Sequence, residues 1–197
     1  MKKKGLVTII IIAVVVLVIY LWFKSGYNAM VEKQEEVEAQ WAQVENVYQR
    51  RADLIPNIVN TVKGYAQHEE STLTAVIEAR AKATSITIDP SNITPEQLEQ
   101  FQMAQDQLSS ALNRLMAVQE NYPDLKANEQ FMALITELEG SENRIAVERR
   151  NFNEKAKEYN QYIRKFPRNI IASMFGFEKV GYFKAKEGAD VAPTVQF

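Results

Sequence analysis

The chain of 197 residues contains no cysteine, which excludes disulfide bonds, thiolate metal ligands and a lipid-modified N-terminal cysteine. It contains one histidine, His68, so a zinc site of the H-E-x-x-H kind has no second histidine ligand. Glycine-rich phosphate loops and a G-x-S-x-G nucleophile motif are also missing. We therefore predict no catalytic residues, no cofactor-binding residues and no metal site.

Glycine and proline are scarce, at seven and six residues, while long stretches are rich in Glu, Gln, Lys, Ala and Leu. This composition is typical of helices. Basic residues are not in excess: without the three leading lysines, 20 basic residues face 25 acidic ones. Because a nucleic-acid interface needs a basic face, we expect no nucleic-acid partner.

One long apolar run is present, and it lies at the N-terminus. Three lysines at positions 2–4 precede eighteen residues, Leu6–Phe23, that are almost entirely apolar. Eighteen helical residues span about 27 Å, close to the thickness of a bilayer's hydrocarbon core. A cleaved signal peptide is the alternative, but the run is longer than a signal core and ends without a small-residue cleavage site. We predict a retained transmembrane helix at residues 6–23, contacting the lipid bilayer through Leu6–Phe23.

The flanking charges predict the orientation of this helix. Basic flanks stay on the cytoplasmic side, so residues 1–5 form a short cytoplasmic N-terminus. The domain at residues 24–183 is then extracytoplasmic, in a single-pass protein of the cell membrane. The charged tail at residues 184–197 is expected to be loosely ordered.

Helical periodicity continues beyond the apolar run. Apolar residues at steps of three and four predict one helix from Tyr27 to about Thr84, kinked at Pro56. Its apolar positions resemble a coiled-coil seam with a seven-residue repeat, so the helix needs partner helices along its length. The seam has three polar interruptions: Gln34, Arg51 and Glu69.

Three more helices are expected. The second begins at a capping box, Thr94–Gln97, and ends at Pro123. The third runs from near Asn128 to Phe166, and a short fourth covers residues 169–174. The predicted fold class is all-α: an N-terminal transmembrane helix followed by an elongated antiparallel helical bundle with long helices. The second helix returns part way, the third runs beside the first, and the aromatic residues at 175–177 and 182–183 fold back onto an end of the bundle.

A polar stripe flanks the apolar one on the first helix. Its members recur at three- and four-residue steps and therefore share one face: Asp53, Asn57, Asn60, Gly64 and His68. One interpretation is a candidate partner-binding face. The other is a solvated face, in which Gly64 allows close helix approach and Asn57 bonds carbonyls freed by Pro56.

Two alternatives invoke different chemistry. A membrane-bound hydrolase would use His68 with carboxylates and a divalent cation, and it requires carboxylates from other helices to converge on that histidine. The second alternative is that the aromatic segment Ile170–Phe183 acts directly on lipid, although the low cationic content of that segment argues against it.

Two long motifs stand out: the segment Arg50–Glu69, and a late run that includes Phe152-Asn153, Tyr159-Asn160 and Phe175-Gly176-Phe177. Together they resemble the LemA family of bacterial membrane proteins, and the resemblance covers nearly the whole stretch from Tyr27 to Phe183. The resemblance implies one membrane span, an elongated helical bundle and no agreed reaction. One departure is Phe152, where the family more often has tyrosine. The residues that match are Tyr27-Asn28, the segment Arg50–Glu69, Glu142, Arg144, Ile145, Arg149, Phe152-Asn153, Tyr159-Asn160, Phe166-Pro167, Asn169, Ala172, Phe175-Gly176-Phe177 and Tyr182-Phe183.

The leading hypothesis is therefore a membrane-anchored, non-enzymatic helical-bundle protein of the bacterial cell envelope. It would act as an interaction or scaffold module for unidentified envelope protein partners. A homo-oligomer is a further expectation, because the polar interruptions of the seam can set the register of self-association.

Overall fold

The computed structural model describes residues 2–66 and 68–185, with side chains from residue 5 onward. These residues form an all-α fold without strands, which confirms the predicted fold class. The helices, in order, are α1 (Lys2–Tyr65), α2 (Glu70–Ser85), α3 (Pro95–Val118), the 3-10 turn η1 (Gln119–Asn121), α4 (Pro123–Lys126), α5 (Glu129–Arg164) and α6 (Arg168–Phe175).

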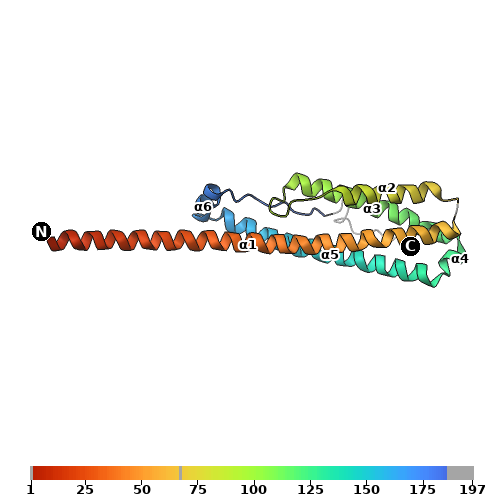
Figure 1. Ribbon diagram of the computed structural model, residues 1–197, viewed down its shortest axis with the longest axis horizontal. Helices are drawn as coiled ribbons and strands as arrows, with labels where there is room; N and C mark the ends of the chain where they lie inside the picture. The colour runs from red at the N-terminus through yellow and green to blue at the C-terminus, as the bar shows by residue number, and fades with distance from the viewer. Residues whose placement is uncertain (1, 67, 186–197) are drawn as a thin grey trace, which may run out of the picture.

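α1 is a single helix that continues from the apolar run into the bundle (Figure 1). Its first part projects alone from one end, and residues 5–22 are all exposed. By length and composition, it is the one helix among the described residues that is able to cross a membrane. The first buried residue is Gly26, so the bundle begins close to the predicted end of the span at Phe23.

Four helices run along the bundle: α1 leads away from the apolar end, α2 returns, α3 leads out again and α5 returns beside α1 (Figure 1). The pairing of α1 with α5 is the most extensive, followed by that of α2 with α3. The prediction that the long third helix packs against the first is thus confirmed. The prediction that the helix beginning at Thr94 returns toward the membrane is wrong, because α3 runs in the same direction as α1.

The end predicted for the first helix, Thr84, is also wrong, since α1 ends at Tyr65 and α2 begins at Glu70. A helix continuing to Thr84 would carry its apolar side chains beyond the far end of α5, where no partner helix lies. The turn instead buries Leu73, Val76 and Ala83 of α2 against α3. The apolar spacing continues unchanged through residues 65–70, but the chain turns there because the turn lets α2 bury these side chains.

The predicted helix starts are confirmed in detail. The Thr94 hydroxyl accepts a hydrogen bond from the Gln97 N–H at 3.2 Å, and the Gln97 side chain accepts one from the Thr94 N–H at 3.1 Å. The Asn128 side chain caps α5 by accepting from the Phe131 N–H at 2.8 Å. These bonds satisfy N–H groups that the first helical turn leaves without partners.

Two apolar cores lie along the bundle axis. The distal core, far from the apolar end, is built mainly from the second half of α1 with α2 and α3, and includes Val62, Leu108 and Phe131. The proximal core centres on the fully buried ring of Trp41, which lies 5.4 Å from the Phe101 ring and 5.6 Å from the Phe152 ring.

The C-terminal strap, residues 177–185, completes the proximal core. It leaves α6 as an extended segment and runs back along the bundle (Figure 1). The Phe183 ring is buried and stacks on Trp41 at 6.1 Å, so this aromatic residue fills the middle of the bundle rather than an end. Lys184 is also held in place, because its backbone N–H and carbonyl form hydrogen bonds with the Gln102 side chain. The rest of the predicted loose tail, residues 186–197, lies outside the described residues.

Side-chain amides hold the strap by its backbone. Asn160 donates to the Val180 carbonyl at 2.9 Å and accepts from the Val180 N–H at 3.0 Å. Asn153 clamps both backbone groups of Phe183 in the same way, at 2.9 Å each. Because each amide satisfies a donor and an acceptor of one residue, an extended chain is accommodated between α3 and α5 without a β-sheet.

Pro56 lies inside α1, and the helix does not end there; the predicted kink stays a prediction. Proline has no N–H, so the carbonyl of Ala52, one turn earlier, loses its helical donor. Arg80 of α2 replaces that donor: its Nε–H donates to the Ala52 carbonyl at 2.8 Å. The proline thus creates a free acceptor on α1 at which α2 docks.

We predict that Arg80→Met lowers the free energy of unfolding by about 1–3 kcal/mol, because it leaves the largely buried Ala52 carbonyl without a donor. The loss is expected to be smaller in a Pro56→Ala background, where the restored backbone N–H donates to Ala52 instead. Denaturant unfolding of the full chain in detergent micelles, followed by circular dichroism, gives the coupling of this double-mutant cycle. Strict additivity would contradict the assignment.

Candidate functional site

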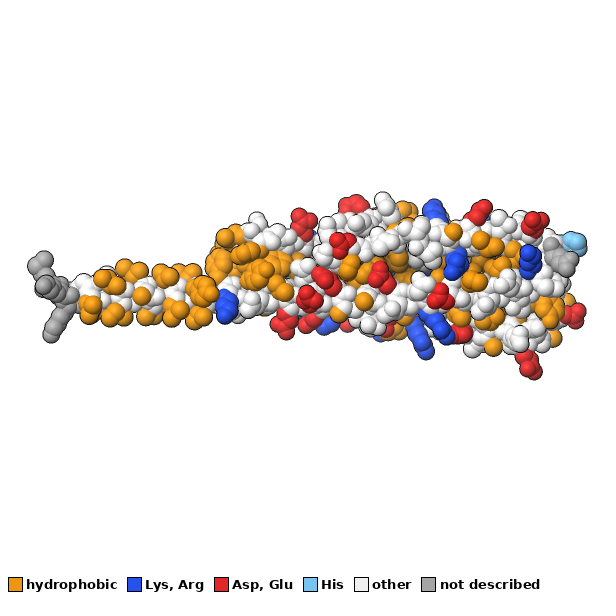
Figure 2. All heavy atoms as spheres, in the orientation of Figure 1, with side chains coloured by type: hydrophobic (Ala, Val, Ile, Leu, Met, Phe, Trp, Pro, Cys, Tyr) orange, Lys and Arg blue, Asp and Glu red, His pale blue; other side chains and the backbone are white. Residues whose placement is uncertain are grey.

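The predicted polar stripe lies at the end of the bundle farthest from the apolar run. Asp53, Asn57, Asn60 and Gly64 are all exposed on the last turns of α1, and we call this group the distal face. His68 is exposed as well but lies in the turn after α1, so it does not share the helix face as predicted. Figure 2 shows this histidine at the tip opposite the apolar helix.

The packing explanations for the distal face find no support. A Cβ added at Gly64 would have no atom within 4 Å, so this glycine does not serve a close helix approach. The carbonyl freed by Pro56 is satisfied by Arg80 rather than by Asn57. The Asp53 carboxylate accepts a hydrogen bond from Gln49 at 2.7 Å on the same helix.

The composition of the distal face works against helix stability. Asparagine, aspartate and glycine are all less favourable than alanine in a helix, and Gly64 is the next-to-last residue of α1. All of these side chains are exposed, so burial does not offset their effect. A face that is only solvated is satisfied equally well by Glu, Lys or Gln, which favour helices. The residue types of the distal face are thus not those that helix stability alone favours.

The hydrolase alternative requires carboxylates from other helices around His68. Among the described residues, no three His, Asp or Glu side chains gather so that they could hold a metal ion. His68 itself is exposed at the tip, next in sequence to Glu69 and Glu70. A Tyr122 hydroxyl lies 3.5 Å from the Glu69 carboxylate, which ties this turn to η1 rather than to a reaction centre.

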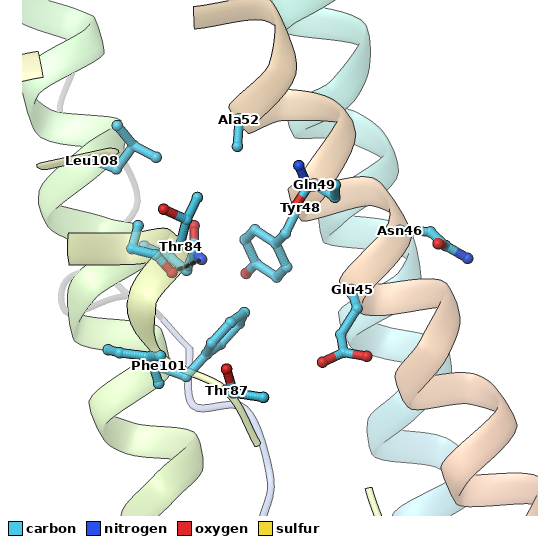
Figure 3. A pocket seen from close by; sticks show the side chains of 12 residues that line it. Glu45, Asn46, Tyr48, Gln49, Ala52, Thr84, Thr87, Phe101 and Leu108 are labelled. Carbon is cyan, nitrogen blue, oxygen red and sulfur yellow. Dashed lines mark hydrogen bonds between the residues drawn. The ribbon is translucent and has the colours of Figure 1, made fainter. Parts of the chain in front are cut away.

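A groove between α1 and the α2–α3 connection was not predicted from the sequence. It encloses about 360 Å³, and Figure 3 shows the Tyr48 ring projecting from α1 toward Thr84 and Phe101. Burial raises the pKa of the Tyr48 phenol, which therefore stays protonated at neutral pH. Tyr48 fits the apolar stripe by its spacing, and only the turn between α1 and α2 brings the opposite wall into place. The groove is lined by Glu45, Asn46, Tyr48, Gln49, Ala52, Ala83, Thr84, Ile86, Thr87, Phe101, Gln105 and Leu108.

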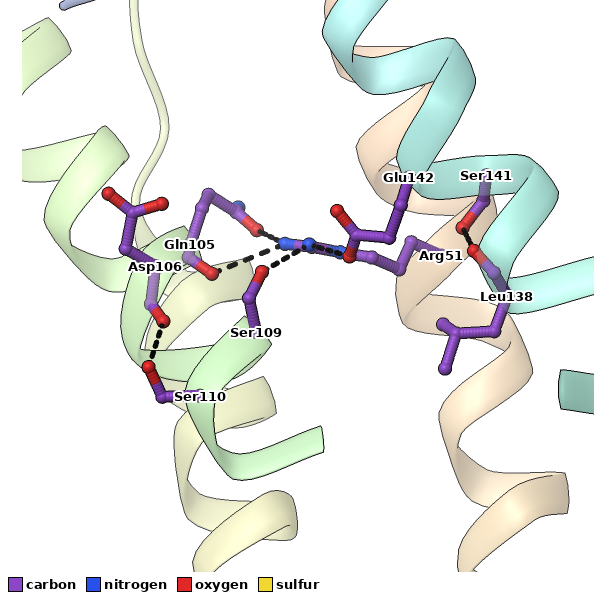
Figure 4. A network of polar contacts seen from close by, with 8 residues as sticks. All are labelled: Arg51, Gln105, Asp106, Ser109, Ser110, Leu138, Ser141 and Glu142. Atoms are coloured by element: carbon purple, nitrogen blue, oxygen red, sulfur yellow. Dashed lines mark hydrogen bonds and ion pairs between the residues drawn. The ribbon is translucent and has the colours of Figure 1, made fainter. Parts of the chain in front are cut away.

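A buried arginine connects the helices beside this groove (Figure 4). Arg51 of α1 is 1% exposed, and its guanidinium donates to Gln105 Oε1 at 2.6 Å and to Ser109 Oγ at 2.8 Å, both on α3. It also forms an ion pair with Glu142 of α5. Gln105 in turn donates to the Ala83 carbonyl of α2 at 3.3 Å. The planar guanidinium of Arg51 thus links α1 directly to α3 and α5, and it reaches α2 through Gln105.

This network changes the interpretation of the polar interruptions in the seam. The two terminal nitrogens of Arg51 donate within its own bundle, while its buried Nε has no hydrogen-bond partner among the described residues. Gln34 donates to Glu38 at 3.0 Å on the same helix. Glu69 lies in the turn after α1, outside any seam. The register argument for a homo-oligomer therefore loses its basis, and self-association stays a prediction without support from these residues.

An apolar helix continuous with a long bundle, without convergent catalytic groups among the described residues, defines a membrane-associated helical protein. Comparison with known proteins gives the family. The LemA family model matches residues 40–197, and the chain belongs to this family.

Three bacterial relatives show the extent of the similarity. Magnetosome protein MamQ of Magnetospirillum gryphiswaldense is 29% identical over 83% of this chain and 66% of its own length. MamQ 1 of Paramagnetospirillum magneticum is 29% identical over 94% of this chain and 74% of its own. Protein LemA of Metamycoplasma hominis is 26% identical over 86% of this chain and 74% of its own. The chain thus spans about two thirds to three quarters of the length of these relatives.

The residues that carry the family resemblance now have a structural reason. Phe152 is fully buried between the Trp41 and Phe183 rings, where the hydroxyl of a tyrosine would need its own partner. Asn153 and Asn160 are the amides that clamp the strap. These residues of the motif therefore attach the C-terminal strap to the bundle.

We predict that Arg51→Lys lowers the free energy of unfolding by about 2–4 kcal/mol, because a lysine ammonium cannot reach acceptors on α3 and α5 together. The neighbouring Arg50 is an internal control: it is 63% exposed and pairs with Glu137, so Arg50→Lys should change stability by about 0.5 kcal/mol or less. Denaturant unfolding of both full-length variants measures the difference. Equal effects would contradict the network.

Proposed function

We propose that this protein is a single-pass, membrane-anchored and non-enzymatic scaffold of the bacterial cell envelope, and that its distal face binds a protein partner. The observation that carries this proposal is the continuity of α1, which begins in the apolar run and ends at the distal face. Forty-two helical residues from Lys24 to Tyr65 span about 63 Å. The bundle therefore holds the distal face, from Asp53 to Gly64, about 45–60 Å from the end of the span.

The orientation in this proposal follows from charge. The lysines at positions 2–4 keep the N-terminus in the cytoplasm, which puts the bundle outside. Retention of the anchor is supported by the helix itself, because α1 passes from the apolar run into the bundle without a break at which a peptidase would find an extended segment.

The chemistry of the distal face selects the kind of partner. One carboxylate, Asp53, and two carboxamides, Asn57 and Asn60, are exposed along about two helical turns. Carboxamides both donate and accept hydrogen bonds, and the carboxylate adds a negative charge. A partner surface rich in hydrogen-bond donors, with a basic residue opposite Asp53, complements this face.

We predict that a photo-crosslinking amino acid in place of Asn60 gives a discrete protein adduct in living cells. Asn113 is a matched control, because it is an exposed asparagine on α3, away from the distal face. The adduct is identified by mass spectrometry and should be lost when Asn57→Arg is added to the same chain. Asn57 is exposed, so this substitution leaves the bundle folded.

Two outcomes would contradict the proposed partner-binding role. Position 60 would give no adduct beyond those obtained from position 113, or its adduct would persist unchanged with Asn57→Arg. An adduct whose only component is a second copy of this chain would instead assign the distal face to self-association.

A further inference from the structure

The short helix α6 has two apolar sides, and one of them is uncovered. Ile171 and Ala172 face the bundle and are buried. On the other side, Ile170, Met174 and Phe175 of α6 are exposed, and Phe166, in the turn just before α6, is exposed as well. Phe166 is 82% exposed and Met174 65%, which is unusual for side chains of this size in water. We call these four residues the α6 ridge.

The α6 ridge lies at the point where α1 leaves its apolar run. Ile171 packs tightly on Gly26: a Cβ added to Gly26 would lie 2.9 Å from the Cδ1 atom of Ile171. The Phe175 ring meets the Tyr27 ring edge-on at 4.8 Å. Phe175 also forms one wall of an apolar groove of about 480 Å³ whose other wall is α1 from Val16 to Asn28. Figure 2 shows the same gathering of apolar side chains where the single helix enters the bundle.

Basic side chains share this level. The ion pairs Lys33–Glu158 and Glu36–Lys155 fix the antiparallel register of α1 and α5, which brings the end of α5 level with Tyr27. Arg164 and Lys165 are exposed there, and Lys24 is exposed on α1. Arg168 of α6 lies with its guanidinium 4.1 Å from the centre of the Tyr162 ring.

We propose that the α6 ridge inserts into the boundary between headgroups and hydrocarbon of the bilayer that holds α1. This inference rests on the proposed membrane anchor. Tyr27 lies four residues beyond Phe23, which is about 6 Å of helix, so the ridge packs on α1 at the depth of the headgroups. The exposed apolar surface continues that of the span itself. The basic residues beside it complement anionic lipid, as in interfacial helices.

The low cationic content of Ile170–Phe183, which argues from sequence against contact with lipid, is therefore compensated by other segments. Arg164 and Lys165 come from the end of α5, and Lys24 comes from α1. The ridge attaches the bundle at a second point beside the span. A bundle held at two points resists tilting at the membrane surface.

The absence of cysteine makes the test direct, because each introduced cysteine carries the only spin label. The full chain is reconstituted in vesicles of phosphatidylcholine and phosphatidylglycerol, labelled in turn through Met174→Cys, Ile19→Cys and Ile77→Cys. Ile19 is in the span, and Ile77 is an exposed apolar residue of α2 far from it. Collision rates with oxygen, which concentrates in lipid, and with a water-soluble nickel complex report the depth of each label.

The label at position 174 should give an oxygen-to-nickel ratio several-fold above that at position 77, approaching that at position 19. Adding Phe166→Ser and Ile170→Ser should return it toward the value at 77, whereas the control Val147→Ser, on exposed α5 surface, should leave it unchanged. If the label at position 174 gives the same oxygen-to-nickel ratio as the label at position 77, while the label at position 19 still reports lipid, the ridge proposal is overturned and the anchor is left intact. A water-like ratio at 19 overturns both. Spin–spin broadening at 174 that disappears on dilution with unlabelled protein overturns the proposal in favour of a second copy.

Discussion

The antiparallel contact between α1 and α5 is the interaction on which the rest of the structure depends. It joins α1, which carries the apolar run, to α5, the second longest helix, and it aligns Lys33 with Glu158 and Glu36 with Lys155. The hydrogen bond from Lys155 lowers the pKa of the Glu36 carboxyl, so this pair is charged at neutral pH. Exposed pairs of this kind add little stability, but they fix the register that apolar packing alone would leave degenerate. That register determines the level of α6 and the height of the distal face.

Two sets of polar contacts attach the other helices to α1 and α5. The buried Arg51 fork reaches α3 and α5, and through Gln105 it reaches α2. The carbonyl that Pro56 leaves unpaired accepts from Arg80 of α2. An apolar seam with a seven-residue repeat allows several alignments, whereas buried polar groups must find particular partners. These contacts therefore select one arrangement of the four helices, and the amide clamps on the strap close the proximal core.

The parts of the fold that local chemistry determines could be predicted from the sequence: the apolar run, the Thr94 capping box and the start of α5 at Asn128. The end of α1 could not, because the apolar pattern keeps its phase through Tyr65 and only the limited length of α5 makes the turn favourable. The strap is held by side-chain amides, which leave no periodic signal. Of the candidate site, Asp53, Asn57, Asn60 and Gly64 are exposed on α1, whereas the turn that follows Tyr65 takes His68 off that helix. Arg51 looked like a defect in a seam because its partners lie 54 and 91 residues away.

In the proposed arrangement, a rigid bundle continuous with a membrane helix holds its distal face far above the bilayer. Neutron reflectometry of the full chain in a supported bilayer measures the thickness of the protein layer outside the lipid. An upright bundle, with α1 running from Lys24 to Tyr65, predicts a layer about 60 Å thick. A layer of about 25 Å, the width of two helices side by side, would mean that the bundle lies flat and would contradict the account.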